Sequence, residues 1–202
     1  MSPTARARSA PTAKEDRRQE LVLAAFNQIA ARGFEGLRTR EVAAEVRLNI
    51  ATLHYYFPTK EALIGGVLDE AMRRFRSTLE PHGSPADQLR NHFRAVQKLL
   101  RTDSRLRAVM GELALRSARD PAMARILRQT NDAWHQTVRG LLRRAVREGH
   151  LRSELDSDDV AALIVAALTS MTLPTVSSAD RMDQTFRQLE RMLGLSGHAV
   201  SA

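Results

Sequence analysis

Apolar residues recur every three or four positions along most of the chain, which is the spacing of one face of an α-helix. The first such stripe begins after Asp16 and ends at Gly33, a residue type that favours helix C-termini. Its apolar positions are Leu21, Val22, Ala25, Phe26 and Ile29. No segment of the chain reads as a strand. The pattern therefore predicts an all-α protein.

Two of the predicted helices are short and lie close together, at residues 39–46 and 50–56. Thr39 and Asn49 can cap them, because Thr and Asn side chains accept hydrogen bonds from the free N–H groups of a first helical turn. Pro58 closes the second helix, since the residue before a proline avoids helical geometry. Short helices joined by a three-residue turn are typical of a helix-turn-helix, whose second helix enters the major groove of DNA. The alternative is a pair of ordinary surface helices in a bundle.

Three rings stand side by side in the second short helix, at His54, Tyr55 and Tyr56. Consecutive residues on a helix cannot all face a core, so at least one ring must be exposed. An exposed tyrosine or histidine can donate hydrogen bonds to phosphate oxygens. Lys60, at the start of the next helix, is unfavourable for the helix dipole, and a nearby phosphate would relieve that conflict.

The remaining stripes predict further helices. The longest is expected at about 122–148, begun by Asp120 and Pro121. Its inward positions are Ile126, Leu127, Trp134, Val138, Leu141, Leu142 and Ala145. A strongly apolar helix follows from about residue 157 to Leu173 and is stopped by Pro174. A last helix is expected at 179–193, with a stripe of Met182, Phe186, Leu189 and Leu193.

The segment 160–168 is apolar nearly all round, so this helix needs cover on more than one side. The stripe around Phe186 supplies a second adhesive face. A partner subunit can supply the cover, and the alternative is that both helices belong wholly to the core of one chain.

Charge and composition narrow the choice of partners. The net charge is +8, which favours polyanions such as DNA, RNA or acidic membranes. Residues 1–60 hold ten Lys and Arg against six Asp and Glu, so the first third is the more densely basic part. Residues 1–14 show no periodicity and are expected to be a disordered basic arm, either a plain tail or a DNA contact. No apolar run is long enough to span a bilayer, and the basic N-terminus is no secretory signal, so a soluble cytoplasmic protein is expected.

Catalytic chemistry has little support in the sequence. The chain has no cysteine, which excludes disulfides, thiolate metal sites and cysteine nucleophiles. Its six histidines are scattered without metal-binding spacing, and no serine lies in a G-x-S-x-G turn. We therefore expect no enzyme activity, no metal site and no cofactor.

The stretch "GFEGLRTREVAAEVRLNIATLHYYFPTKEAL" resembles the N-terminal DNA-binding region of TetR-family transcriptional regulators. The similarity covers about residues 17–68 without a gap. The matching segments are Arg40-Glu41-Val42-Ala43, Thr52-Leu53, Tyr56-Phe57-Pro58 and Lys60-Glu61-Ala62-Leu63. A weaker resemblance to the family covers residues 147–163. The chain departs from the pattern with Arg47 and Ala51 in place of glycines, His54 in place of tyrosine, and Arg38 where a capping threonine often stands.

The resemblance implies a fold and a division of the chain. It implies about nine helices, with a helix-turn-helix DNA-binding domain at 15–61 and a helical ligand-binding and dimerisation domain at 62–202. The expected DNA contacts are Thr39, Arg40, Asn49, Ile50, Thr52, His54, Tyr55, Tyr56 and Lys60. It further implies a homodimer, in which the last two helices of each chain form a four-helix bundle.

The function implied by the resemblance is a sequence-specific repressor that a small-molecule effector releases from a pseudo-palindromic operator in double-stranded DNA. Candidate effector contacts are Phe93, Met110, Leu113, Trp134 and Met171, although each also fits plain core packing. The alternative function is a helix-turn-helix architectural or adaptor protein that senses no small molecule.

Overall fold

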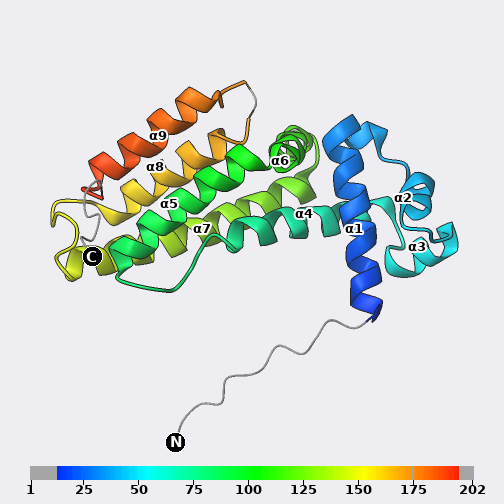
Figure 1. The fold of residues 1–202 in the computed structure, drawn as a ribbon, viewed down its shortest axis with the longest axis horizontal. Coiled ribbons are helices and arrows are strands. Elements are labelled where there is room, and N and C mark those ends of the chain that lie inside the picture. Colours follow the sequence, from blue (N-terminus) through cyan, green and yellow to red (C-terminus); the bar gives the residue numbers. More distant parts are fainter. Residues whose placement is uncertain (1–12, 174, 196–202) are drawn as a thin grey trace, which may run out of the picture.

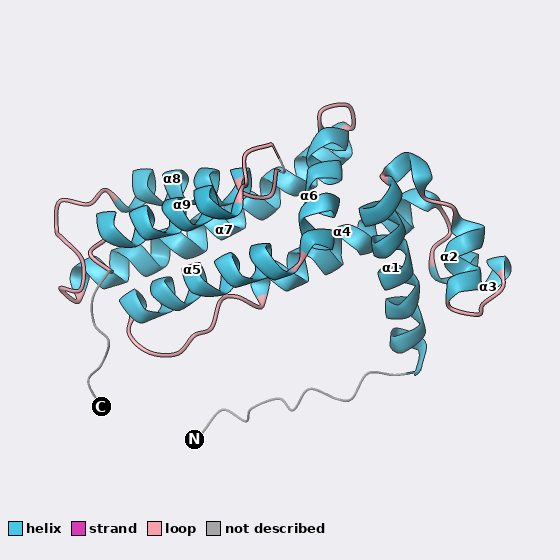
Figure 2. Ribbon diagram, turned by 45° about the horizontal axis from the view of Figure 1, so that its top comes forward, coloured by secondary structure: helices cyan, strands magenta, loops and turns pink. Residues whose placement is uncertain are grey.

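The computed structural model describes residues 13–173 and 175–195, and within those ranges every regular element is a helix (Figures 1 and 2). The elements are α1 (Ala13–Arg32), the short 3-10 helix η1 (Phe34–Gly36), α2 (Thr39–Glu45), α3 (Ile50–Tyr56), α4 (Lys60–Arg76), α5 (Pro85–Thr102), α6 (Ser104–Ser117), α7 (Pro121–Arg147), α8 (Ser157–Ser170) and α9 (Ala179–Met192). The predicted all-α fold is confirmed, with nine α-helices in the described part of the chain.

The helices form two groups joined by α4 (Figure 1). Helices α1, α2 and α3 lie at one end of the molecule, while α5, α7, α8 and α9 lie alongside one another at the other end. Helix α4 runs from the first group to the second, and α6 packs against both α1 and α4. The short helices α2 and α3 therefore project from the end that is farthest from α8 and α9.

Two hydrophobic cores correspond to these groups. The first is built from α1 to α4 together with α6, and it buries all five apolar positions predicted for the first helix. The second is built from α5, α7, α8 and α9. Phe75, near the end of α4, packs against both cores. Phe75 therefore lies at the boundary between the two cores.

Helix capping follows the sequence at most termini. Asn49 Oδ1 accepts hydrogen bonds from the backbone N–H of Thr52 at 2.7 Å and from its hydroxyl at 2.9 Å. Asp120 and Asp156 cap α7 and α8 in the same way. The predicted cap at Thr39 is wrong, because Thr39 is the first residue of α2 and the N-cap is Arg38, which makes no side-chain hydrogen bond.

Three boundary and burial predictions need correction. Helix α1 begins at Ala13, so residues 13 and 14 of the predicted arm are helical, and residues 1–12 lie outside the described residues. Helix α8 ends at Ser170 rather than Leu173, and Pro174 also lies outside the described residues. Ile126 was expected to point inward but is 40% exposed, and it lines a cavity.

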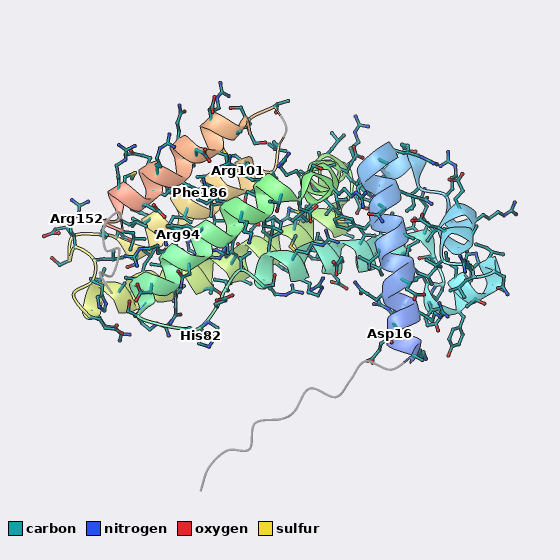
Figure 3. All side chains as sticks on the ribbon, viewed as in Figure 1. Asp16, His82, Arg94, Arg101, Arg152 and Phe186 are labelled. Atoms are coloured by element: carbon teal, nitrogen blue, oxygen red, sulfur yellow. The ribbon has the colours of Figure 1, made fainter. Side chains whose placement is uncertain are left out.

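The apolar stripe of α9 is buried within its own chain. Phe186 lies on the side of α9 that faces α5 (Figure 3), and it packs in the second core with Met182 and Leu189. Arg101 on α5 donates to Asp183 of α9 at 3.0 Å, which fixes the same pair of helices from outside. The stripe therefore does not supply the exposed adhesive face that the sequence suggested.

The turn between α2 and α3 holds Arg47 in the left-handed region, with φ of 57°. The Arg47 N–H donates to Ala44 O at 3.0 Å and the Leu48 N–H donates to Ala43 O at 2.8 Å. This pair of bonds is the Schellman ending of a helix, in which the left-handed residue is usually glycine. The departure from glycine at Arg47 therefore places a side chain where the backbone disfavours one.

We expect Arg47→Gly to raise the free energy of unfolding by about 0.5–1 kcal/mol, because glycine adopts this conformation without the steric penalty. Urea unfolding measures the change. Glu45→Gly, in the last turn of α2 at an exposed position, is the matched control and should lower stability by a similar amount. Equal destabilisation by both variants would contradict the argument.

Candidate functional site

Helix α3 has one buried side and one free side. Leu53 and the adjoining Phe57 lie in the first core, against α1 and α4. Of the predicted DNA contacts, the exposed ones are Arg40, Asn49, His54 and Tyr55, and the partly buried ones are Thr39, Ile50, Thr52, Tyr56 and Lys60. All nine belong to α2, α3, their connecting turn or the first residue of α4, so the fold brings them to one end of the molecule (Figure 2).

The three consecutive rings of α3 are divided between solvent and core. Tyr55 is 68% exposed and His54 is also exposed, whereas Tyr56 packs partly against the first core. The Tyr55 and Tyr56 rings meet edge to face, with centroids 5.2 Å apart. Tyr55 therefore projects from a ring pair that limits its movement.

The start of α1 adds two cations to this surface, Lys14, which the sequence analysis assigned to the basic arm, and Arg18, which was not among the predicted contacts. Lys14 Nζ lies 5.1 Å from the centre of the Tyr55 ring, and a hydrogen bond with Tyr55 raises the pKa of Lys14. The Arg18 guanidinium lies 4.8 Å from the Phe57 ring centre. The signal was present in the sequence as basic residues at positions 14 and 18, one helical turn apart, before the first apolar stripe.

Several polar groups of the surface are already held by the protein. The Thr52 hydroxyl donates to Asn49, which leaves its lone pairs and the Asn49 amide N–H groups available to a ligand. Lys60 Nζ lies 3.5 Å from Phe34 O and so leans toward η1. Helix α3 contains no acidic residue. The free face of α3 thus offers hydrogen-bond donors without acidic residues, and Arg40 of α2 adds positive charge beside it, which suits the phosphates and base edges of DNA.

A buried ion-pair network ties this end of the molecule to the rest. The carboxylate of Glu70 on α4 accepts hydrogen bonds from Arg73 at 2.7 Å, Arg74 at 2.8 Å and Gln19 of α1 at 3.0 Å. Burial by itself would raise the pKa of Glu70, but these donors outweigh it and lower the pKa to about 2. Arg74 also donates to Asp103 at 2.6 Å, so the network joins α4 to the start of α6.

A cavity of about 520 Å³ lies where the two cores meet, bounded by α4, α6, α7 and α8. Its lining residues are Met72, Phe75, Arg76, Leu79, Met110, Ile126, Gln129, Thr130, Asn131, Ala133, Trp134, Thr137, Leu168, Thr169 and Thr172. Of the predicted effector contacts, Met110 and Trp134 are among them. Phe93, Leu113 and Met171 are not, because they are buried in the cores. Such a volume, with mostly apolar walls, is typical of small-molecule sites.

The indole of Trp134 is fixed by a histidine that sequence reasoning did not select. Trp134 Nε1–H donates to His92 Nε2 at 2.9 Å, while His92 Nδ1 lies 2.9 Å from the Thr78 hydroxyl. That hydroxyl donates to Phe75 O at 2.6 Å, so Nδ1 carries the proton and the ring is neutral. His92 is only 2% exposed, and burial lowers its pKa to about 4 despite the hydrogen bond with Thr78.

The described residues contain no arrangement for a metal site or a membrane-spanning helix. No group of three or more His, Cys, Asp or Glu side chains in residues 13–173 and 175–195 could hold a metal ion. In the same ranges, no helix is both long enough and apolar enough to cross a membrane.

A projecting helix-turn-helix joined to a helical domain with a cavity defines a class of DNA-binding regulators. Residues 21–67 match the family model of bacterial regulatory proteins of the tetR family, and residues 79–188 match that of the tetracyclin repressor-like C-terminal domain. The chain belongs to the TetR family of transcriptional regulators.

Individual relatives and solved structures are similar over most of the chain. The nucleoid occlusion factor SlmA of Haemophilus influenzae is 25% identical over 188 residues, covering 90% of this chain and 86% of that protein. A transcriptional regulator from Saccharomonospora viridis, solved in complex with choline, has a TM-score of 0.72 at 23% identity, covering 90% of this chain and 97% of that one. AibR, solved with isovaleryl coenzyme A and operator DNA, has a TM-score of 0.65 at 19% identity, covering 88% and 97%.

We expect the free energy of unfolding to fall by about 2 kcal/mol between pH 7 and pH 5. The unfolded chain protonates His92 near its ordinary pKa of 6.5, whereas the folded chain protonates it only near pH 4. The folded pKa is depressed, so the stabilisation is complete above pH 6.5 and is lost as pH falls toward 4. Glu70, whose pKa is lowered to about 2, changes the free energy of unfolding mainly below pH 5.

Urea unfolding at a series of pH values measures this dependence. His92→Gln keeps an acceptor for the Trp134 N–H but does not titrate. Between pH 7 and pH 5 its free energy of unfolding should therefore fall less than that of the native protein, by about 2 kcal/mol. A parallel pH dependence in the variant and the native protein would show that other groups are responsible.

Proposed function

We propose that the protein is a repressor that binds a pseudo-palindromic operator as a homodimer and leaves it when a small molecule occupies the Trp134 cavity. The observation that carries the proposal is the pairing, in one chain, of a projecting helix-turn-helix with a cavity walled by α4 and α6. Both of these helices pack against α1 of the DNA-binding end. A ligand in the cavity therefore contacts the helices that support the recognition helix.

The DNA contacts divide by their chemistry. Asn49, Thr52 and His54 lie on α3 or at its cap and are placed to reach base edges in the major groove. Arg40, Tyr56 and Lys60 are placed to contact phosphates, which position the protein but carry no sequence information. Lys14 and Arg18 extend the phosphate-binding surface along α1. The remaining predicted contacts, Thr39, Ile50 and Tyr55, complete the surface around these residues.

The homodimer is proposed to form through the outward face of α8, together with α9. Leu163 is 48% exposed, and its exposed neighbours on that face are Ala162 and Ala166. These three positions carry no charge, unlike the outward face of α9, which presents Arg181, Arg187 and Arg191. A second copy of α8 would cover this apolar face and give the helix the two-sided burial that its composition requires.

A DNA-binding adaptor without an effector is the alternative, and SlmA shows by its name that a relative can serve nucleoid occlusion. A fully packed C-terminal core would favour it. The 520 Å³ cavity beside Trp134 counts against it and favours a ligand-responsive protein. Since such regulators act on chromosomal DNA and are in general not enzymes, we propose a non-catalytic protein of the cytoplasm.

Selection of bound duplexes from a random pool by the purified full-length protein tests the DNA-binding part of the proposal. We expect a palindrome with half-sites about 34–36 Å apart, or a multiple of that spacing, because a two-fold dimer presents two recognition helices. Recovery of no motif, with binding that vanishes as salt rises, would reduce the interaction to non-specific attraction.

Two variants then separate base contacts from phosphate contacts on the selected duplex. Lys60→Ala should weaken binding to all sequences alike, whereas Thr52→Ala should relax preference at one position in each half-site by about 1–3 kcal/mol. The Thr52 variant also loses a hydrogen bond to Asn49, so its helical content is compared with that of the native protein. Identical sequence preferences in both variants would contradict these roles.

We expect Leu163→Arg to convert the protein to a monomer at micromolar concentration, because a buried unpaired charge opposes association. Sedimentation equilibrium measures the change, and circular dichroism checks that the helices remain. The matched control is Leu115→Arg on α6, where the leucine is 66% exposed and lines a groove with Phe34 and Pro121 that includes no residue of α8. A dimer that survives Leu163→Arg, or dissociates equally with Leu115→Arg, would place the interface elsewhere.

A further inference from the structure

The Trp134 cavity lies at the seam between the two hydrophobic cores. Met72 and Met110 line it from the side of the first core, while Leu168 and Trp134 line it from the second. Phe75 belongs to both sides. The apolar part of the wall therefore includes two aromatic rings, whose centroids are 6.5 Å apart. An apolar ligand body, and a ring in particular, is the natural complement of such a wall.

The cavity has one charged lining residue, Arg76 in the last turn of α4. Within the described chain, the Arg76 side chain makes neither an ion pair nor a hydrogen bond. The contrast with its neighbours is sharp, because Arg73 and Arg74 of the same helix are both paired with Glu70. No carboxylate lines the cavity. The only formal charge among the lining residues is therefore positive, and no lining carboxylate pairs with the guanidinium.

Two amide side chains, Gln129 and Asn131 of α7, supplement this cation. Neither amide makes a hydrogen bond with the described part of the protein, and Asn131 is half-buried. Both can donate N–H groups to a ligand. By contrast, the hydroxyls of Thr130, Thr137 and Thr172 already donate to helix carbonyls, so they can only accept. The unused donors thus come from Arg76, the two amides and the Thr169 hydroxyl, which makes no hydrogen bond within the described residues.

We infer that this cavity takes an amphipathic organic anion, namely a monocarboxylate with an apolar, ring-bearing body, and that Arg76 binds the carboxylate. The inference depends on the proposed function in one respect only, namely that this ligand is called the effector. The carboxylate accepts charge-assisted hydrogen bonds from the guanidinium. The apolar body packs against the Phe75 and Trp134 side chains, which line the cavity together. An organic cation of the same shape would meet an unpaired positive charge and no carboxylate.

The chain contains one tryptophan, so the fluorescence of Trp134 reports binding directly and without DNA. The probes are 4-phenylbutyrate, 4-phenylbutanamide and 4-phenylbutylamine, which share one body and differ in the charge of one end. We expect the carboxylate to change the emission with an affinity about tenfold higher than that of the amide. The amine should bind more weakly than the amide. Because Arg76 is partly in solvent, added salt should weaken only the carboxylate.

Arg76→Gln should lower carboxylate affinity to that of the amide and abolish its salt dependence. Arg125→Gln is the matched control, since Arg125 is an exposed arginine on α7 that does not line the cavity, and it should change neither value. Equal binding of carboxylate and amine, unchanged binding in Arg76→Gln, or no response to the carboxylate at millimolar concentration would each overturn the inference.

The same ligands, added to the protein bound to its selected duplex, separate this inference from the proposed function. Carboxylate binding that depends on Arg76 but does not release the duplex would support the ligand class and overturn release by an effector. Selection of a palindrome together with equal affinity for all three probes would support the regulator and overturn the ligand class.

Discussion

The position of the DNA-binding end depends on one buried carboxylate, that of Glu70, which is 3% exposed. An unpaired carboxylate at such a place would cost several kcal/mol, so its partners are required rather than optional. Gln19 brings α1 to it, and Arg74 carries the network on to Asp103, whose other oxygen caps α6. The Arg74 guanidinium also lies 4.2 Å from the centre of the Phe26 ring. Three helices from different parts of the sequence therefore meet with little freedom to rotate.

This constraint explains how a cavity in one half can affect a helix in the other. Met72, Phe75 and Arg76 line the cavity within two turns of Glu70 on the same helix. On the other wall, α6 carries Met110 into the cavity and holds η1 through Glu112, which accepts from the Phe34 N–H at 3.1 Å. A ligand that separates α4 from α6 would act on both supports of the recognition helix. A coupling free energy of about 1–3 kcal/mol, which is the usual size, requires only that the ligand bind more tightly to one arrangement of α4 and α6 than to the other.

The sequence predicted well whatever depends on local periodicity, such as the stripe from Leu21 to Ile29, the cap at Asn49 and the short helix pair. The sequence did not predict which element covers each apolar face. The stripe around Phe186 predicted a face that needs cover, and α5 of the same chain supplies it, because spacing along one helix does not identify the covering element. Phe93 and Phe75 are both apolar helix positions, yet only Phe75 borders empty space. Cavities arise from the misfit of several helices, which a single stripe does not encode.

The three arginines that end α4 show the same limit for charge. Arg73, Arg74 and Arg76 look equivalent in the sequence and could all be assigned to a solvated helix end that favours the dipole. The fold gives Glu70 to the first two and leaves the third at the cavity. The Glu70 network therefore pairs two of these arginines and leaves Arg76 as the one charged residue that lines the cavity. Part of the net charge of +8 thus lies at the cavity of the C-terminal half, away from the helix-turn-helix end, because the fold decides which surface each arginine reaches.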